Sequence, residues 1–261
     1  MLLSIVECSD YRLYSKTKPK TPSVNKINEE IEIIGSVVGP DIATMRNLGA
    51  RQAQGQWIFF KDEDCKVEVG TLYKIIQNLN RAQSNPDALG GVYRCYGKGL
   101  LEKAYNIIQR KWVLSGIRKN KFSGWHDGER LLGGALLIKK QALESIGGFN
   151  ETIGWGGEEF DLTLRLREKG LRTAVSYRLI VEHRNSLSVV GFLKRAWYQN
   201  FNRSYFKIKS ADVGLFRKSS YLETKNKFVL PILLFFGVAS LGSASGQLAR
   251  LFKKRRLPWK G

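Results

Sequence analysis

The sequence predicts an α/β fold, in which a mostly parallel central sheet is flanked by helices. Short apolar segments typical of strands alternate along the chain with amphipathic segments typical of helices. Residues 57–60 (WIFF) are apolar throughout, as expected of a parallel strand that is covered on both faces. The chain has 261 residues, of which 43% are hydrophobic, so it is long and apolar enough for a large core.

Local signals set the expected boundaries of these elements. Gly39 and Pro40 end the second strand, and Asp41 can cap the helix that follows. Residues 10–26 are polar, basic and interrupted by two prolines, so we expect a loop there. Strands are predicted at 2–6, 31–38, 57–60, 89–93, 131–138, 173–175 and 179–182, and helices at 42–54, 71–79, 100–114 and 140–146 and from Glu158 onward.

The charge of the chain is strongly basic and uneven. Its formal net charge is +20, and residues 184–261 hold 16 Lys and Arg against 2 acids, which gives +14 of that total. Such a charge requires an anionic partner. We favour an anionic membrane surface over nucleic acid, because no helix-turn-helix, zinc-finger or RNP-like motif is present. Three cysteines without metal-type spacing, and a start unlike a signal peptide, favour a reduced, cytoplasmic location.

An acidic triplet follows the strand at 57–60. Ligands of open parallel sheets bind beyond the carboxyl ends of the strands, so Asp62, Glu63 and Asp64 lie where a ligand is expected. Asp62 and Asp64 alternate across one residue, and two such carboxylates can face one hard divalent cation. That cation could hold a diphosphate. A solvated acidic turn is the equally probable structural alternative.

A second acidic segment, 154–161 (GWGGEEFD), places Trp155 between glycines and directly before three acids. An acidic helix cap would explain the carboxylates alone. On a helix start, however, the side chains of Glu158 and Glu159 diverge by about 100°. One could then accept a proton from a reacting hydroxyl while the other orients the substrate. We expect the helix N-terminus to keep such a base ionised.

The two histidines of the chain differ in how well their positions fit a functional role. His183 ends a late predicted strand and could ligate a metal through its neutral imidazole, although a lone histidine is more often structural. His126 lies in a glycine-flanked polar loop, where a contact with substrate is a weaker possibility.

Taken together, these motifs resemble the family 2 type of GT-A-fold glycosyltransferases. Residues 45–55 (MRNLGARQAQG) followed by WIFFKDED are similar to that family's arginine-asparagine helix and DxD strand end. Residues 133–135 (GGA), 147–151 (GGFNE) and 154–161 follow the order of the β-1,4-galactosyltransferase pattern, including its WGGE(E/D) segment. The resemblance extends from about residue 57 to 184.

The resemblance implies a role for each matching residue. Asp64 and His183 would bind Mn²⁺ (or Mg²⁺), and Glu159 would be the catalytic base, where the family has Asp. The remaining roles concern the substrates: Arg46, Asp62, Asp64 and Trp155 would bind the nucleotide-sugar donor, and Trp155 and Glu158 the acceptor. A UDP-sugar is the favoured donor, and the acceptor would be a glycan or a lipid-linked saccharide.

The C-terminal region differs in character from the rest. Residues 186–209 predict an amphipathic helix, which could lie on a membrane or pack on the domain. Residues 228–249 carry no charge and are nominally long enough to span a bilayer, while a buried helix is the alternative. The basic run 253–256 suits anionic headgroups. We therefore expect a GT-A catalytic domain at 1–184 and a helical, membrane-associating extension at 185–261.

The sequence thus predicts an inverting, metal-dependent glycosyltransferase on the cytoplasmic face of the membrane, acting in surface polysaccharide synthesis. A catalytically silent nucleotide-sugar-binding or scaffold protein is the first alternative, because residues 5–11 depart from the family's usual first strand end. A basic nucleic-acid-binding protein is the less favoured one.

Overall fold

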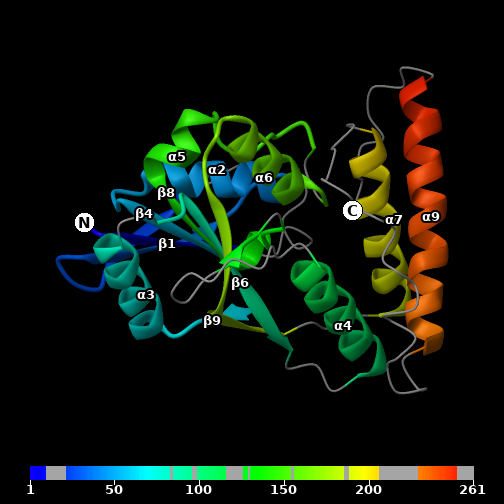
Figure 1. The fold of residues 1–261 in the computed structure, drawn as a ribbon, viewed down its shortest axis with the longest axis horizontal. Helices are drawn as coiled ribbons and strands as arrows, with labels where there is room; N and C mark the ends of the chain where they lie inside the picture. The colour runs from blue at the N-terminus through cyan, green and yellow to red at the C-terminus, as the bar shows by residue number, and fades with distance from the viewer. Residues whose placement is uncertain are drawn as a thin grey trace.

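The computed structural model describes residues 1–9, 22–82, 85–95, 99–115, 126–128, 130–153, 156–184, 188–205 and 229–251. Within these ranges a nine-stranded sheet runs through the larger part of the molecule, and a pair of long helices lies along one side (Figure 1). The strands follow one another in the order β2-β3-β1-β4-β8-β6-β9-β5, and β7 pairs with β9. The α/β class is therefore confirmed.

The strands agree with the predicted segments in most places. Their bounds are β1 (Leu3–Cys8), β2 (Ser23–Lys26), β3 (Ile31–Val37), β4 (Trp57–Asp62), β5 (Cys65–Lys66), β6 (Ala88–Cys95), β7 (His126–Asp127), β8 (Leu136–Lys139) and β9 (Thr173–His183). All residues of β4 from Trp57 to Phe60 are buried, as their unbroken apolar run predicts. The strand β1 lies between β3 and β4 and is parallel to both.

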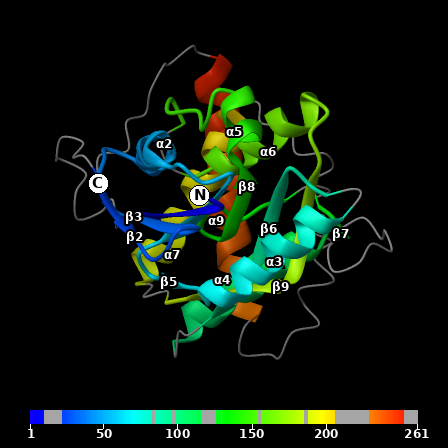
Figure 2. The same ribbon diagram turned by 90° about the vertical axis from the view of Figure 1, so that its left-hand side faces the viewer.

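The helices cover both sides of this sheet. They are α2 (Ile42–Gln52), α3 (Val69–Arg81), α4 (Leu100–Ser115), α5 (Lys140–Ser145), α6 (Glu158–Glu168), α7 (Val189–Tyr205) and α9 (Val229–Leu251). Asp41 caps α2 as predicted, because its side chain accepts a hydrogen bond from the backbone N–H of Thr44 at 2.8 Å. The helices α2 and α3 lie on opposite sides of the sheet (Figures 1 and 2).

Three predictions about the strands need correction. The sheet is mixed rather than mostly parallel, because β8 is antiparallel to both of its neighbours, β4 and β6. The expected loop at 10–26 contains β2, which pairs with β3 at the sheet edge, where polar side chains stay exposed. The two late strands predicted at 173–175 and 179–182 form a single strand, β9. Tyr177 and Arg178 are exposed, but they continue the strand between the two predicted segments.

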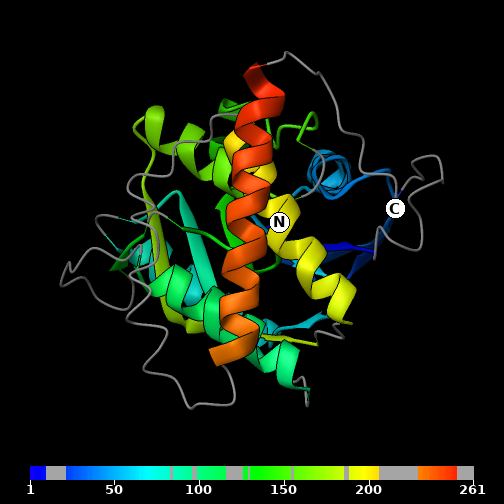
Figure 3. The ribbon, with the colours of Figure 1, turned by 90° about the vertical axis from the view of Figure 1, so that its right-hand side faces the viewer.

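A second, smaller core joins α4 to the C-terminal helices. Its buried members are Ala104, Tyr105, Ile108, Phe192, Ala196, Ile232, Phe235 and Ala239. The helix α9 crosses α7 closely, as Figure 3 shows from the side of these helices. A Cβ atom at Gly242 would lie 2.5 Å from the carbonyl oxygen of Trp197, and one at Gly246 would lie 2.3 Å from that of Phe201. The small residues of α9 thus permit the contact.

The predicted C-terminal helices are confirmed within the described residues, as α7 and α9. Residues 230–249 of α9 are long and apolar enough to cross a membrane. One side of α9 is buried in the second core, whereas Leu230, Leu233, Leu234 and Leu241 are exposed. The helix is therefore partly buried, and its outer side is apolar. The basic run 253–256 lies outside the described residues.

Candidate active site

A cavity of about 430 Å³ lies at the carboxyl ends of β1, β4 and β9, where the sequence predicts a ligand site. The sheet contributes Cys8, Asp62 and His183 to its wall. Helices close the opposite side, through Tyr105 of α4 and Gln199 of α7. The C-terminal helical region therefore contributes directly to the cavity.

The guanidinium of Arg46 is the centre of the cavity's ion pairs. Its Nη1 donates to Oε1 of Glu158 at 2.9 Å, and its Nη2 donates to Oδ1 of Asp62 at 3.2 Å. The side chains of Arg46 and Glu158 are only 3% and 6% exposed, whereas that of Asp62 is 31% exposed. Burial opposes the charge of Arg46, but the two carboxylates more than offset it and raise its pKa. Arg46 therefore holds Asp62 and Glu158 in place.

Two adjacent glycines make room for this arrangement. A Cβ atom at Gly133 would lie 2.4 Å from Nη1 of Arg46. One at Gly134 would lie 2.6 Å from Oδ2 of Asp62 and equally close to the hydroxyl of Tyr93. The segment Gly133–Ala135 is a short 3₁₀ turn that precedes β8, rather than the strand that the sequence predicts. Its glycines let charged side chains approach the backbone.

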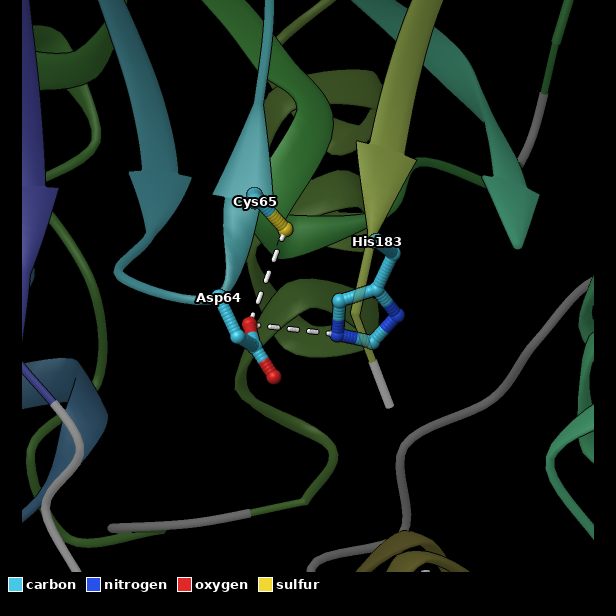
Figure 4. Close-up of side chains that lie close together, drawn as sticks. All are labelled: Asp64, Cys65 and His183. Atoms are coloured by element: carbon cyan, nitrogen blue, oxygen red, sulfur yellow. Dashed lines mark hydrogen bonds and ion pairs between the residues drawn. The ribbon is translucent and has the colours of Figure 1, made fainter. Parts of the chain in front are cut away.

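Asp64 and His183 meet at the carboxyl end of the sheet, with Nε2 of His183 3.3 Å from Oδ1 of Asp64 (Figure 4). Strand pairing brings them together, because β5 is antiparallel to β9 with Cys65 opposite His183. The backbone N–H of Arg184 also donates to the carbonyl of Asp64 at 2.8 Å. The imidazole is 5% exposed and stacks on Tyr93, with ring centroids 4.6 Å apart. The geometry therefore fixes both side chains.

Cys65 is a third neighbour, which no sequence motif indicates. Possible ligand atoms of Asp64, Cys65 and His183 all lie within 4.8 Å of one another. Burial is the main cause that raises the pKa of the Cys65 thiol, and the charges of Asp62 and Asp64 add to it. A carboxylate suits Mn²⁺ and Mg²⁺ better than a cysteine sulfur does. Asp64 and His183 are therefore the better metal-binding pair.

Helix α6 begins at the second acidic segment, as predicted. Gly156 and Gly157 precede it with φ values of 75° and 119°, which side chains other than glycine rarely adopt. The first turn then carries Glu158, which pairs with Arg46, and Glu159, which lines the cavity. The turn thus places two adjacent carboxylates on the cavity, and Glu158 is the one that pairs with Arg46.

The surroundings of Glu159 oppose the ionisation that its position at the helix start favours. Burial first, and then the charge of Glu158 and a hydrogen bond with it, raise the pKa of Glu159 well above the usual carboxyl range. A helix N-terminus stabilises a negative charge by only about 0.3–1 kcal/mol at the surface. Burial beside a like charge shifts a carboxyl pKa further than that.

The other predicted site residues are distributed as follows. Trp155 lies outside the described residues. His126 is in β7, with its ring centroid 5.5 Å from that of Tyr177, and it is not among the described residues that line the cavity. The donor role predicted for Arg46 and the acceptor role predicted for Glu158 stay predictions, since the structure shows their contacts within the chain only.

Comparisons with known proteins agree with this architecture. Residues 38–211 match the family described as "Glycosyltransferase like family 2". The chain belongs to that family. A curated relative, the putative polypeptide N-acetylgalactosaminyltransferase 13 of Drosophila melanogaster, is 27% identical over 131 residues. That match covers 46% of this chain and 24% of the relative, so this family 2 chain spans only a part of the relative's length.

Solved structures include one whose fold is similar to that of this chain. The mannosyltransferase PcManGT from Pyrobaculum calidifontis, in complex with GDP-Man and Mn²⁺, is similar with a TM-score of 0.50 and 13% identity. That likeness covers 96% of this chain and 79% of the other. GalNAc-T7 with UDP, GalNAc and Mn²⁺ has a TM-score of 0.48 and 12% identity over 94% of this chain and 57% of its own. The expected GT-A fold is confirmed for this glycosyltransferase-family chain.

Proposed function

We propose that this chain is an inverting glycosyltransferase that moves a sugar from a nucleotide-sugar donor to a glycan or glycolipid acceptor. The proposal rests on one observation: a single cavity holds both a candidate metal-binding pair and a candidate proton acceptor. Asp64 and His183 meet on one wall, and Glu159 lies on the same cavity. A UDP-sugar is the favoured donor, and Mn²⁺ (or Mg²⁺) the favoured metal.

The residues at the strand ends fit such a metal. One carboxylate and one imidazole, 3.3 Å apart and already fixed by strand pairing, form a suitable donor pair for a divalent cation. Asp64 and His183 would hold the ion, while Asp62 would face the ribose or the ion from its ion pair with Arg46. When bound, the metal would neutralise charge on the donor diphosphate.

Glu159 is the proposed general base. Its raised pKa makes the ionised Glu159 a stronger proton acceptor than an ordinary carboxylate, which suits this role. The acceptor hydroxyl gives its proton to Glu159, and its oxygen forms the bond to the anomeric carbon. The bond from that carbon to the diphosphate oxygen breaks, and the nucleotide diphosphate leaves with the electron pair.

Two further cationic side chains support the leaving group. Arg184 and Arg195 both line the cavity, from the end of β9 and from α7. Positive charge facing the place where negative charge develops lowers the barrier to transfer. We assign the catalytic domain to residues 1–184 and the membrane-associated extension to 185–261, with Arg195 as a contribution of the extension to the site.

The apolar outer side of α9 and the basic C-terminal sequence support association with an anionic membrane surface. We place the enzyme on the cytoplasmic face, in the synthesis of a surface polysaccharide. The association with an anionic membrane surface is tested with labelled protein on anionic and on neutral vesicles. High salt should release the protein from the anionic vesicles. Equal binding to both kinds of vesicle would contradict the electrostatic part of the proposal.

A donor screen tests the proposed activity. Purified protein is incubated with UDP- and GDP-sugars, with Mn²⁺ or with a chelator, and released nucleotide is measured. We expect one donor to be turned over only with the metal, and Asp64→Ala to abolish that turnover. Nucleotide binding without any turnover would instead favour the catalytically silent alternative.

A further inference from the structure

The strand ends that carry Asp64 and His183 also hold a thiol against them. Cys65 lies directly opposite His183 in the antiparallel pairing of β5 with β9. Side chains of directly opposite residues lie on the same face of a sheet, so the thiol and the imidazole share one side. In Figure 4 the Sγ atom of Cys65 and the imidazole of His183 both approach the same oxygen of Asp64.

The possible ligand atoms of these three residues have nearly the spacing of a tetrahedral metal site. Oδ1 of Asp64 lies 3.3 Å from Nε2 of His183 and 3.8 Å from Sγ of Cys65. The ligand atoms of all three residues lie within 4.8 Å of one another. Bond lengths to Zn²⁺ of about 2.0–2.2 Å for nitrogen and oxygen and about 2.3 Å for sulfur put tetrahedral ligands about 3.3–3.6 Å apart. Small side-chain rotations would therefore bring the three atoms onto one ion.

The chemistry of the three ligands favours a softer ion than Mn²⁺. Carboxylate oxygens suit Mn²⁺ and Mg²⁺, whereas thiolate and imidazole suit Zn²⁺, which also binds a given site more tightly than Mn²⁺ does. A coordinating metal displaces the thiol proton, which passes to solvent. Cys65 is 1% exposed and is not among the described residues that line the main cavity, whereas Asp64 and His183 do line it. An ion bound to all three side chains therefore lies deeper than one bound to Asp64 and His183 alone.

We propose that Asp64, Cys65 and His183 form a zinc site that overlaps the proposed Mn²⁺ site and inhibits the protein when it is filled. The two sites share Asp64 and His183, so the two ions exclude each other. The binding of zinc depends only on the three side chains. The inhibition rests on the proposed function, because it concerns the donor diphosphate.

Charge explains why zinc would inhibit. Zn²⁺ held by one carboxylate and one thiolate retains no net positive charge to attract a diphosphate, whereas Mn²⁺ held by the Asp64–His183 pair retains one. A tetrahedral zinc ion with three protein ligands also leaves a single open position. Zinc occupancy should therefore block the metal-dependent binding of the nucleotide diphosphate.

Cobalt is a spectroscopic probe of this site, because Zn²⁺ itself does not absorb visible light. Co²⁺ is added to the metal-free, reduced full chain. We expect a sulfur-to-cobalt charge-transfer band in the near ultraviolet and the strong visible bands of tetrahedral coordination, and Zn²⁺ should abolish both because it binds more tightly. Absence of the charge-transfer band at saturating Co²⁺ would overturn the proposal.

Two matched cysteine variants identify the sulfur ligand. Cys65→Ser should remove the charge-transfer band and weaken Zn²⁺ binding by more than the roughly tenfold that loss of an outer-shell partner costs, while Mn²⁺ binding stays nearly unchanged. Cys8→Ser is the control, because Cys8 is equally buried at a strand end and lines the main cavity but is not part of the three-residue group. It should retain the band and the zinc affinity. A band that persisted in Cys65→Ser, or that was lost equally in Cys8→Ser, would exclude the assigned ligand.

X-ray absorption at the zinc edge makes the same test without a substitution in the buried strand. The wild type with one equivalent of Zn²⁺ should show one sulfur at about 2.3 Å and nitrogen or oxygen ligands at about 2.0–2.2 Å. Ligands of nitrogen and oxygen alone would overturn the proposal, even if Cys65→Ser failed to fold.

The inhibition is measured by titrating UDP into the Mn²⁺-loaded protein at increasing Zn²⁺ concentrations. Zn²⁺ should weaken UDP binding to the wild type, and Cys65→Ser should need more than about tenfold more Zn²⁺ for the same effect. Full UDP affinity with zinc bound would contradict the inhibition. A chain that bound zinc through Cys65 but turned over no donor and bound no UDP would refute the proposed function and leave the zinc site standing.

Discussion

Replacement of Arg46 by methionine should destabilise the fold strongly. The substitution keeps an apolar chain of similar length but removes the countercharge from Glu158, which is 6% exposed, and from Asp62, which is 31% exposed. Breaking a buried ion pair on one side costs about 3–5 kcal/mol, because a charge stays buried without its partner. We assign nearly all of this cost to Glu158, since water can reach Asp62.

A double-mutant cycle measures the coupling. The free energy of unfolding is determined by urea titration for the wild type, Arg46→Met, Glu158→Gln and the double variant. Removing the stranded charge should restore about 1–3 kcal/mol in the double variant relative to Arg46→Met alone. Arg51→Met, at an exposed position on the same helix, is the control and should change stability by less than about 0.5 kcal/mol. Losses that simply add in the double variant, or a loss below about 1 kcal/mol for Arg46→Met, would refute the assigned role of Arg46.

Three further predictions concern the site glycine, the base and the helix pair. Gly134→Ala should reduce nucleotide release more than tenfold, because its Cβ atom would displace the carboxylate of Asp62; near-normal kinetics would count against that contact. Burial and a neighbouring carboxylate raise the pKa of Glu159 in the folded state. The folded protein therefore keeps the stability contributed by the protonated Glu159 at acidic pH, and it loses that stability as pH rises through the raised pKa. Transfer should increase over the same pH interval, and Glu159→Gln should abolish transfer at every pH; a variant that kept the wild-type pH profile would exclude this base. Gly242→Ala should lower the melting temperature, since its Cβ atom would meet α7, whereas Gly237→Ala on the same helix has open space and should stabilise by about 0.5–1 kcal/mol; equal thermal shifts would contradict the close packing of the two helices.

The elements that the sequence predicts well are those whose signals are local. Asp41 caps α2 through a contact with a residue three positions away, and the unbroken apolar run of β4 indicates by itself that the strand is buried. The position of β8 is different. It lies between β4 and β6 and is antiparallel to both, which depends on the topology of the whole chain. An apolar segment alone predicts a strand but not its direction.

The site shows the same limit. The pairing of Asp64 with His183 follows from the antiparallel register of β5 and β9, which neither sequence segment contains. That register also brings Cys65 to the cluster, and no spacing of cysteines signals it. The ionisation of Glu159 depends on burial and on the side chain of Glu158, whereas the sequence shows only the helix start that both residues share.

Asp64 and His183 are proposed to hold the metal that the donor diphosphate requires. This pair is tested most directly by isothermal titration of UDP in the presence and absence of Mn²⁺ into the wild type, Asp64→Ala and Glu144→Ala. We expect metal-dependent binding in the wild type, its loss in Asp64→Ala and its retention in Glu144→Ala, where an exposed acid outside the cavity is removed. UDP binding with the same affinity and the same dependence on Mn²⁺ in Asp64→Ala would contradict this role of Asp64.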